Sequence, residues 1–504
     1  LRLRTLRAAS LGDAVETTLI APGEDEGGAG LRIGERQRLA DPARGSGDED
    51  AGGGHVTLIA AGRAAGKCAG DGPAAAPVAT SQPMRHIGRP ILVDVTRLET
   101  RRRFGAPTGI DRVEFAYAER YLRDATSDAV SLTPLGPRLP SPERVRSMLD
   151  SLSARWHGAE RADDPATDRL RTWLAGTPVP PAPPPHGLGS SKLSRIADRA
   201  RHGFEASMLR DAERHAPRHA IYLHVSHLRL DRPPMFAWLG RRPDIRPVFF
   251  VQDLIPIEFP EYGVPGEAQR HRIRIETVCR HAAAVVTSSD AVAESLRRYA
   301  AAEGLPVPER IVTSPLGVEE AFLGTPSPFL SARPYFVVCS TIEGRKNHLL
   351  LLQLWRDLTR RLPPDEMPAL VVVGRRGWES EAAIDLLERC EAIRPHVIEA
   401  PNLPTGALAS LMAGARALLM PSFSEGYGVP VAEAVALGTL VIASDIPSHR
   451  EITRGEAILL DPLDGPAWRE AIRAAAASPQ GLKVPRAATW DAHFAIVERL
   501  LASL

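Results

Sequence analysis

The stretch PSFSEGYGVPVAEAVALG, from Pro421 to Gly438, follows an apolar run that ends at Met420 and leads into an alanine-rich segment with helical character. Gly426 and Gly428 allow the backbone to approach a ligand without interference from a Cβ atom, and Pro430 suits the first turn of a helix. The free N–H groups and the dipole of such a helix start favour an anion. The stretch therefore predicts a strand, a loop that can seat a diphosphate, and a helix.

Two carboxylates and two cations accompany this loop. Glu425 lies in the loop and Glu433 lies eight residues later in the helix, so the two carboxylates can each bind a set of sugar hydroxyls. Arg345 and Lys346 stand next to each other where another predicted helix begins, and such a pair can neutralise a departing diphosphate. The alternatives are a solvated helix with incidental glutamates and an ordinary surface pair of basic residues.

Strand and helix patterns alternate on both sides of this segment. After about residue 326 the predicted strands are 335–339, 370–374, 396–399, 417–420 and 440–443, separated by single helices. Before about residue 326, the predicted strands are 91–95, 129–132, 220–225, 248–251 and 284–287. Single-helix crossovers produce mostly parallel sheets that are covered on both faces. We therefore expect an α/β protein with two such units and a cleft between them, and ligands at the carboxyl ends of the strands.

The composition assigns the remaining segments. Residues 1–86 are rich in Gly, Ala and acidic residues and predict a disordered leader or an over-extended reading frame, with Met84 as a candidate start. The expected division is 87–325 for the N-terminal unit with an insertion at about 137–215, 326–485 for the C-terminal unit, and 486–504 for a closing helix.

Charge and cysteine content exclude several classes of protein. The 62 basic and 61 acidic residues leave a net charge of +1, which gives no overall field for nucleic acid. The four cysteines have no metal-ligand spacing and fit a reducing cytoplasm. His224 and His227 should point to opposite faces of a strand, and the acidic triplet 48–50 lies in the leader, so no metal site is predicted. We expect a cytoplasmic protein, with peripheral contact to the inner membrane as an open option.

Several motifs together resemble the retaining glycosyltransferases of family four, the group 1 glycosyl transferases of bacterial polysaccharide biosynthesis, which have the GT-B fold of two Rossmann-like domains. The segment 421–438 is similar to their signature, and 339–348 is similar to their diphosphate loop. The segment 107–113 resembles their N-terminal glycine loop. Gln252 stands where the family usually has a histidine, so that histidine's role cannot be carried over. The resemblance covers roughly residues 89–504.

The resemblance implies transfer of a hexose from a nucleotide-diphosphate sugar to a hydroxyl of a saccharide or lipid-linked acceptor, with retention of configuration. It implies that Glu425 contacts the donor sugar, Glu433 the ribose, and Arg345 and Lys346 the diphosphate. Further residues expected at the donor are Gly109, Thr341, Gly426, Tyr427, Gly428 and Val429. The segment 341–343 resembles mannosyltransferases and favours GDP-mannose. No cofactor or metal is expected. The alternatives are another GT-B enzyme, such as a nucleotide-sugar epimerase, and a non-catalytic nucleotide-sugar-binding protein.

Overall fold

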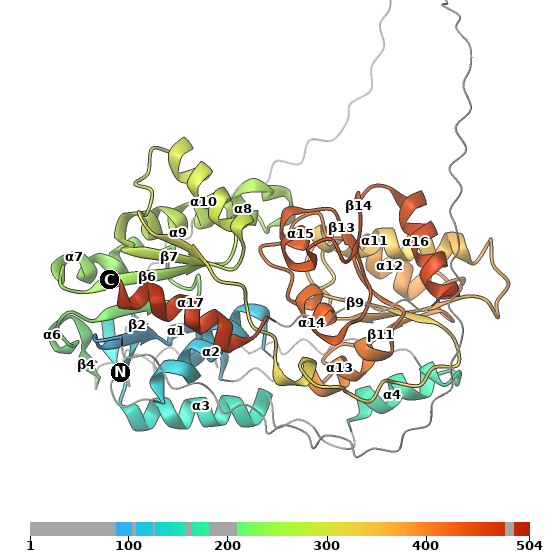
Figure 1. Ribbon diagram of the computed structural model, residues 1–504, viewed down its shortest axis with the longest axis horizontal. Coiled ribbons are helices and arrows are strands. Elements are labelled where there is room, and N and C mark those ends of the chain that lie inside the picture. Colours follow the sequence, from blue (N-terminus) through green and yellow to red (C-terminus); the bar gives the residue numbers. More distant parts are fainter. Residues whose placement is uncertain (1–86, 103–106, 124–126, 157–163, 181–208, 479–487) are drawn as a thin grey trace, which may run out of the picture. The chain divides into compact units, whose positions relative to one another are not determined.

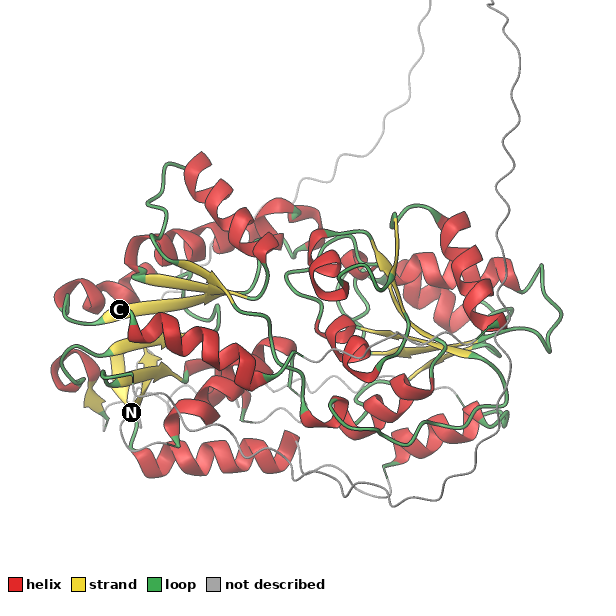
Figure 2. Ribbon diagram, in the orientation of Figure 1, coloured by secondary structure: helices red, strands yellow, loops and turns green. Residues whose placement is uncertain are grey.

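The structure is a computed structural model that describes residues 87–102, 107–123, 127–156, 164–180, 209–478 and 488–504. The predicted leader, including Met84 and the acidic triplet, lies outside these ranges. Among the helices that the structure describes, none combines the length and the apolar character needed to cross a membrane. The described residues form two sheets with helices packed around them (Figures 1 and 2).

The first sheet has eight strands in the order β4-β3-β2-β1-β5-β6-β7-β8. The strands are β1 (Ile91–Asp94), β2 (Ser127–Thr133), β3 (Gly136–Leu139), β4 (Arg210–Asp211), β5 (Ile221–His224), β6 (Arg246–Val251), β7 (Ala284–Thr287) and β8 (Ile311–Thr313). Pairing from β2 through β8 is parallel, whereas β3 pairs antiparallel with β2 and β4. The strands β3 and β4, from the two ends of the segment predicted as an insertion, therefore extend the sheet at one edge.

The second sheet has six strands, all parallel, in the order β11-β10-β9-β12-β13-β14. The strands are β9 (Tyr335–Cys339), β10 (Ala369–Val373), β11 (Val397–Glu399), β12 (Ala417–Met420), β13 (Val441–Ser444) and β14 (Ile458–Leu460). The first five match the predicted strands to within two residues at each end, and β14 was not predicted. In β9, Phe336 and Val337 enter different hydrophobic clusters, which shows that both faces of the sheet are covered.

The helices complete the alternation that the sequence predicts. Those before residue 326 are α1 (Thr96–Arg101), α2 (Gly109–Leu122), α3 (Pro142–Trp156), α4 (Pro165–Leu174), α6 (Ala212–His215), α7 (Ala237–Arg241), α8 (Ile255–Glu258), α9 (Glu267–His281) and α10 (Asp290–Ala302). Those after it are α11 (His348–Leu358), α12 (Glu381–Arg389), α13 (Thr405–Gly414), α14 (Val429–Leu437), α15 (Pro447–Thr453), α16 (Gly465–Ala477) and α17 (Trp490–Ala502). Short 3-10 helices lie at Pro233–Phe236 (η1), Pro260–Tyr262 (η2), Glu320–Phe322 (η3) and Gly344–Lys346 (η4).

Two helices pack against elements that are distant in the sequence. The C-terminal helix α17 packs on α2, where the Tyr117 hydroxyl lies 2.8 Å from Nε2 of His493 and the Tyr117 and Phe494 rings are 5.1 Å apart. Helix α4 belongs to the predicted insertion, yet Arg169 donates a hydrogen bond of 3.0 Å to the carbonyl of Glu399 at the end of β11. A helix thus lies within the segment 486–504, and α4 of the predicted insertion contacts the second sheet.

Candidate functional site: a carboxylate and cation cluster at the start of helix α14

The loop between β12 and α14 is shaped by its glycines. Gly428 has a φ of 105° and caps α14, and Pro430 occupies the first turn of that helix. A Cβ atom on Gly426 would lie 2.4 Å from the carbonyl oxygen of Gln252, just beyond β6. The sequence suggested that Gly426 leaves room for a ligand, but in the structure it leaves room for the first sheet. At the start of α14, Pro430 has no N–H, and the N–H groups of Val431 and Ala432 donate to the carbonyl of Gly428, so these groups are not free for an anion.

Glu425 forms ion pairs with both predicted cations. Nζ of Lys346 lies 2.5 Å from one carboxylate oxygen of Glu425, and Nη1 of Arg345 lies 3.1 Å from the other. Arg345 also donates to Glu343, at 2.8 Å. The side chains of Glu425, Arg345 and Lys346 are only 8%, 17% and 13% exposed. Glu425 lies close to Arg345 and Lys346 because β9 and β12 are neighbours in the sheet, so the segments that follow their carboxyl ends lie side by side.

Glu425 and Lys346 both have shifted pKa values. Burial would raise the pKa of Glu425, but the nearby Lys346 and Arg345 outweigh it and hold that pKa well below its usual range. Burial lowers the pKa of Lys346, and the attraction of Glu425 only partly offsets it. Glu425 is therefore an anion at neutral pH. The group is arranged to handle charge rather than to supply a proton.

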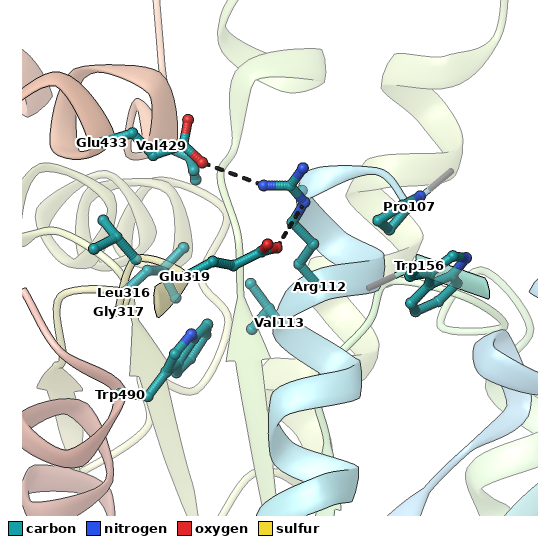
Figure 3. A pocket seen from close by; sticks show the side chains of 12 residues that line it. Pro107, Arg112, Val113, Trp156, Leu316, Gly317, Glu319, Val429, Glu433 and Trp490 are labelled. Carbon is teal, nitrogen blue, oxygen red and sulfur yellow. Dashed lines mark hydrogen bonds and ion pairs between the residues drawn. The ribbon is translucent and has the colours of Figure 1, made fainter. Parts of the chain in front are cut away.

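Glu433 pairs with a different cation, which comes from helix α2 beside the first sheet. Nη1 of Arg112 in α2 lies 3.2 Å from Glu433, and Nε of Arg112 lies 3.2 Å from Glu319 (Figure 3). Burial raises the pKa of Glu433 to about 7, because desolvation outweighs the attraction of Arg112. The three charged residues line a cavity of about 70 Å³, and Gly109 and Val429 also line it. Arg112, which lies in the segment 107–113, is thus paired with two carboxylates and is not a solvated surface charge.

The remaining predicted donor residues occupy distinct places. Gly109, Val429 and Glu433 share the cavity of Figure 3, and Gly428 immediately precedes Val429. The Tyr427 hydroxyl donates to the carbonyl of Leu316 at 3.2 Å, so this side chain ties the loop to the segment before η3. Thr341 is exposed after β9. The structure thus brings Arg345 and Lys346 to Glu425, and Gly109 and Val429 to Glu433, whereas Tyr427 and Thr341 lie outside these two clusters. The roles of all these residues toward a donor remain predictions.

His449 was missed by the sequence reasoning. It is fully buried at the start of α15, and its Nδ1 lies 2.9 Å from the carbonyl oxygen of Ser444. Its Nε2 has no hydrogen-bond partner among the described residues and would lie 3.5 Å from a Cβ on Gly428. A buried polar atom of this kind beside the signature loop is a signal that only the folded chain provides. The charges of Glu425 and Lys346 both act on it.

The histidine pair considered for a metal is separated in the structure. His224 ends β5, fully buried, with its Nδ1 3.0 Å from the Tyr222 hydroxyl. His227 lies in the turn that follows, not on the strand as predicted. Within the part of the chain that the structure describes, no group of three or more His, Cys, Asp or Glu side chains is arranged to hold a metal ion.

Parts of the chain are similar in sequence to known glycosyltransferases. Residues 326–487 match the family model "Glycosyl transferases group 1". A serotype-specific mannosyltransferase, WbdA of Escherichia coli, is 27% identical over 223 residues, which is 42% of this chain and 27% of the relative. The O-antigen chain mannosyltransferase B of Escherichia coli is 31% identical over 179 residues, which is 32% of this chain and 44% of the relative. The chain thus spans about a quarter to somewhat under half of the length of these two relatives.

Solved structures resemble the whole described fold. The Anabaena protein Alr3699/HepE, crystallised with UDP and glucose, matches with a TM-score of 0.50 at 15% identity, covering 82% of this chain and 95% of that one. At this identity the likeness establishes the fold, which is the GT-B fold that the sequence predicts. Arg345, Lys346, Glu425 and Glu433 all lie within residues 326–487, the part of the chain that matches the Glycosyl transferases group 1 model.

Proposed function

We propose that the protein is a retaining hexosyltransferase that moves a hexose from a nucleotide-diphosphate sugar to a saccharide or lipid-linked saccharide acceptor in polysaccharide biosynthesis. The favoured donor is GDP-mannose. The observation that carries the proposal is the convergence of Arg345 and Lys346 on Glu425, in the loop that leads into α14. The mannosyltransferase names of the relatives support the choice of sugar.

The chemistry follows from where charge develops. When the bond between the hexose and the diphosphate breaks, negative charge grows on the leaving diphosphate, and Arg345 and Lys346 are placed to stabilise it. Glu425 would bind hydroxyls of the hexose and Glu433 those of the ribose. A glycosidase would instead need two carboxylates that flank one bond. We therefore favour front-face substitution, in which the leaving diphosphate takes the proton from the acceptor hydroxyl.

A donor titration tests the proposal. GDP-, UDP- and dTDP-sugars are added to the protein while the thermal midpoint is followed, and NMR then records nucleotide release and the configuration of the new anomeric bond with and without a lipid-linked acceptor. We expect one nucleotide class to bind and to be released only with acceptor. Lys346→Ala should lower turnover by about two to three decades. Arg469→Ala, which removes a cation of α16 that pairs with Asp357 on α11, is the matched control and should not lower turnover.

Other outcomes would assign another class. Conversion of the donor into an isomer without acceptor would indicate an epimerase. Tight donor binding without any turnover would indicate a nucleotide-sugar-binding protein. If no nucleotide sugar binds at millimolar concentration, or if Lys346→Ala keeps wild-type turnover, the proposal is wrong.

A further inference from the structure

Three aromatic side chains from three separate segments gather beside the Glu425 cluster. The rings of Tyr262 in η2 and Phe423 in the signature loop stack with centroids 5.7 Å apart and an interplanar angle of 7°. The indole N–H of Trp378 donates to the carbonyl of Tyr262 at 2.9 Å. We call Tyr262, Phe423 and Trp378 the aromatic platform. Trp378 is 46% exposed, and the other two side chains are partly exposed.

The loop that carries Trp378 is held firmly in place. A Cβ on Gly374 would lie 1.9 Å from the carbonyl oxygen of Ser340, so this loop packs directly against the segment after β9. The N–H of Gly377 donates to the carbonyl of Ile342 at 2.8 Å. Glu379, directly after the tryptophan, has a φ of 50°, which is costly for a residue with a Cβ atom. The chain therefore fixes a large ring that it leaves half exposed.

Burial does not explain such an arrangement. A tryptophan face contributes most to stability when it leaves water, and the one polar atom of the Trp378 ring already has its partner in the Tyr262 carbonyl. What remains available is an apolar ring surface with a fixed orientation. An aromatic face that is held in one orientation and is open to water can pack against the apolar face of a ligand.

The platform borders the residues assigned to the donor. The N–H of Phe423 donates to the carbonyl of Arg345 at 2.9 Å, and Phe423 precedes Glu425 by two residues. A Cβ on Gly344 would lie 3.9 Å from Cδ1 of Tyr262, so the platform also touches the turn that carries Lys346. A sugar ring on the platform would therefore be a neighbour of a hexose bound by Glu425.

We propose that the aromatic platform seats a pyranose ring of the saccharide acceptor, an inference that rests on the function proposed above. A pyranose has an apolar C–H face that packs on an aromatic ring and a rim of hydroxyls that need hydrogen-bond partners. The exposed carboxylate of Glu379, next to Trp378, can accept from that rim. The occupant is a saccharide because its hydroxyl must reach the hexose at Glu425, which the platform adjoins.

A structural clasp is the competing explanation. In that case the rings only hold η2 against the second sheet, and removing Trp378 would weaken donor binding and folding together. An acceptor seat predicts a different pattern, because it affects the saccharide and leaves the donor unchanged. The two explanations therefore differ in whether the substitution weakens binding of the saccharide alone or binding of the donor as well.

The experiment measures both ligands on the full-length protein and its Trp378→Ala, Trp378→Phe and Tyr299→Ala variants. Binding of α-linked mannotriose is followed by saturation-transfer NMR and binding of GDP-mannose by calorimetry. We expect Trp378→Ala to weaken mannotriose binding by about three- to tenfold, since aromatic contacts contribute on this scale, and Trp378→Phe to retain part of it. Donor affinity should stay within about twofold in all variants. Tyr299, a partly exposed tyrosine of α10, is the control and should have no effect on either ligand.

The results separate this inference from the proposed function. Unchanged mannotriose binding in Trp378→Ala, an equal loss of donor and mannotriose, or no mannotriose binding by a wild-type protein that binds GDP-mannose would each overturn the acceptor seat. If the wild-type protein binds no nucleotide sugar but binds mannotriose in a Trp378-dependent way, the transferase proposal fails and the saccharide site stands.

Discussion

The protonation of Glu433 should make the stability of the protein fall as pH rises through neutrality. Burial raises the pKa of this carboxyl from 4.5 to about 7, and the side chain is 3% exposed, so solvent screens it little. An acid with a raised pKa binds its proton more tightly in the folded state. Its contribution is therefore fully present below the unfolded value and is lost as pH rises through the folded value.

The size of the effect follows from the shift. A difference of about 2.5 units at about 1.36 kcal/mol each corresponds to about 3.4 kcal/mol in total, of which about 2.5 kcal/mol is lost between about pH 5 and about pH 8. Other groups titrate in this range, so the informative quantity is the difference in free energy of unfolding between the wild type and Glu433→Gln, measured by urea titration at each pH. That difference should decline by about 2.5 kcal/mol across the window.

The variant Arg112→Gln supplies the matched control. Removing the guanidinium takes away the main attraction that opposes burial, so the decline should extend to higher pH. A difference between wild type and Glu433→Gln that stays flat, or that increases with pH, would refute the reasoning. An increase would mean that Arg112 dominates and that the folded carboxyl is more acidic than the unfolded one.

Three further predictions concern the same site. Glu425→Ala leaves two buried cations without their shared partner and should lower the free energy of unfolding by about 3 to 5 kcal/mol. Lys346→Ala leaves Glu425 paired with Arg345 and should lower it clearly less. Equal losses in urea unfolding would contradict the observed pairing. Gly426→Ala should weaken donor binding and destabilise the protein, because its Cβ would meet the Gln252 carbonyl. The Cβ of Gly109→Ala would meet nothing within 4 Å, so this variant should not destabilise the protein. A Gly426→Ala variant with an unchanged thermal midpoint would contradict the close approach. Turnover should survive a chelator such as EDTA, because Arg345 and Lys346 supply the positive charge, and a chelator-sensitive rate restored by Mg²⁺ would reject that expectation.

Much of the fold could be predicted because the strands of the second sheet are separated by single helices. Buried parallel strands appear as short continuous apolar runs, which is why the prediction placed β9 to β13 closely. The strand β14 has three residues, all only partly buried, so its pattern is weak. The two-residue strand β4 depends on pairing with β3 across more than 70 residues, which no local pattern contains.

The site likewise contains residues that local patterns could group and residues that meet only through distant contacts. Arg345, Lys346 and Glu425 could be grouped in advance because each follows a strand, and β9 and β12 are neighbours. Arg112 pairs with a carboxylate 321 residues away, and its neighbourhood in the sequence indicates only a turn and a helix start. His449 likewise becomes noticeable only when its buried Nε2 is found without a partner. Contacts between sheets could not be predicted, because they depend on packing rather than on local periodicity.

The two clusters share a feature that bears on how a donor would enter. Each carboxylate assigned to the donor is already held by a cation: Glu425 by Arg345 and Lys346, and Glu433 by Arg112. A ligand must therefore exchange these partners, because buried charges that lose one partner need another. Phosphate oxygens can replace the carboxylates on the cations, and hydroxyls can replace the cations on the carboxylates. Since a nucleotide-diphosphate sugar carries both kinds of group in one molecule, it satisfies both halves of the exchange, whereas pyrophosphate or a free sugar satisfies only one.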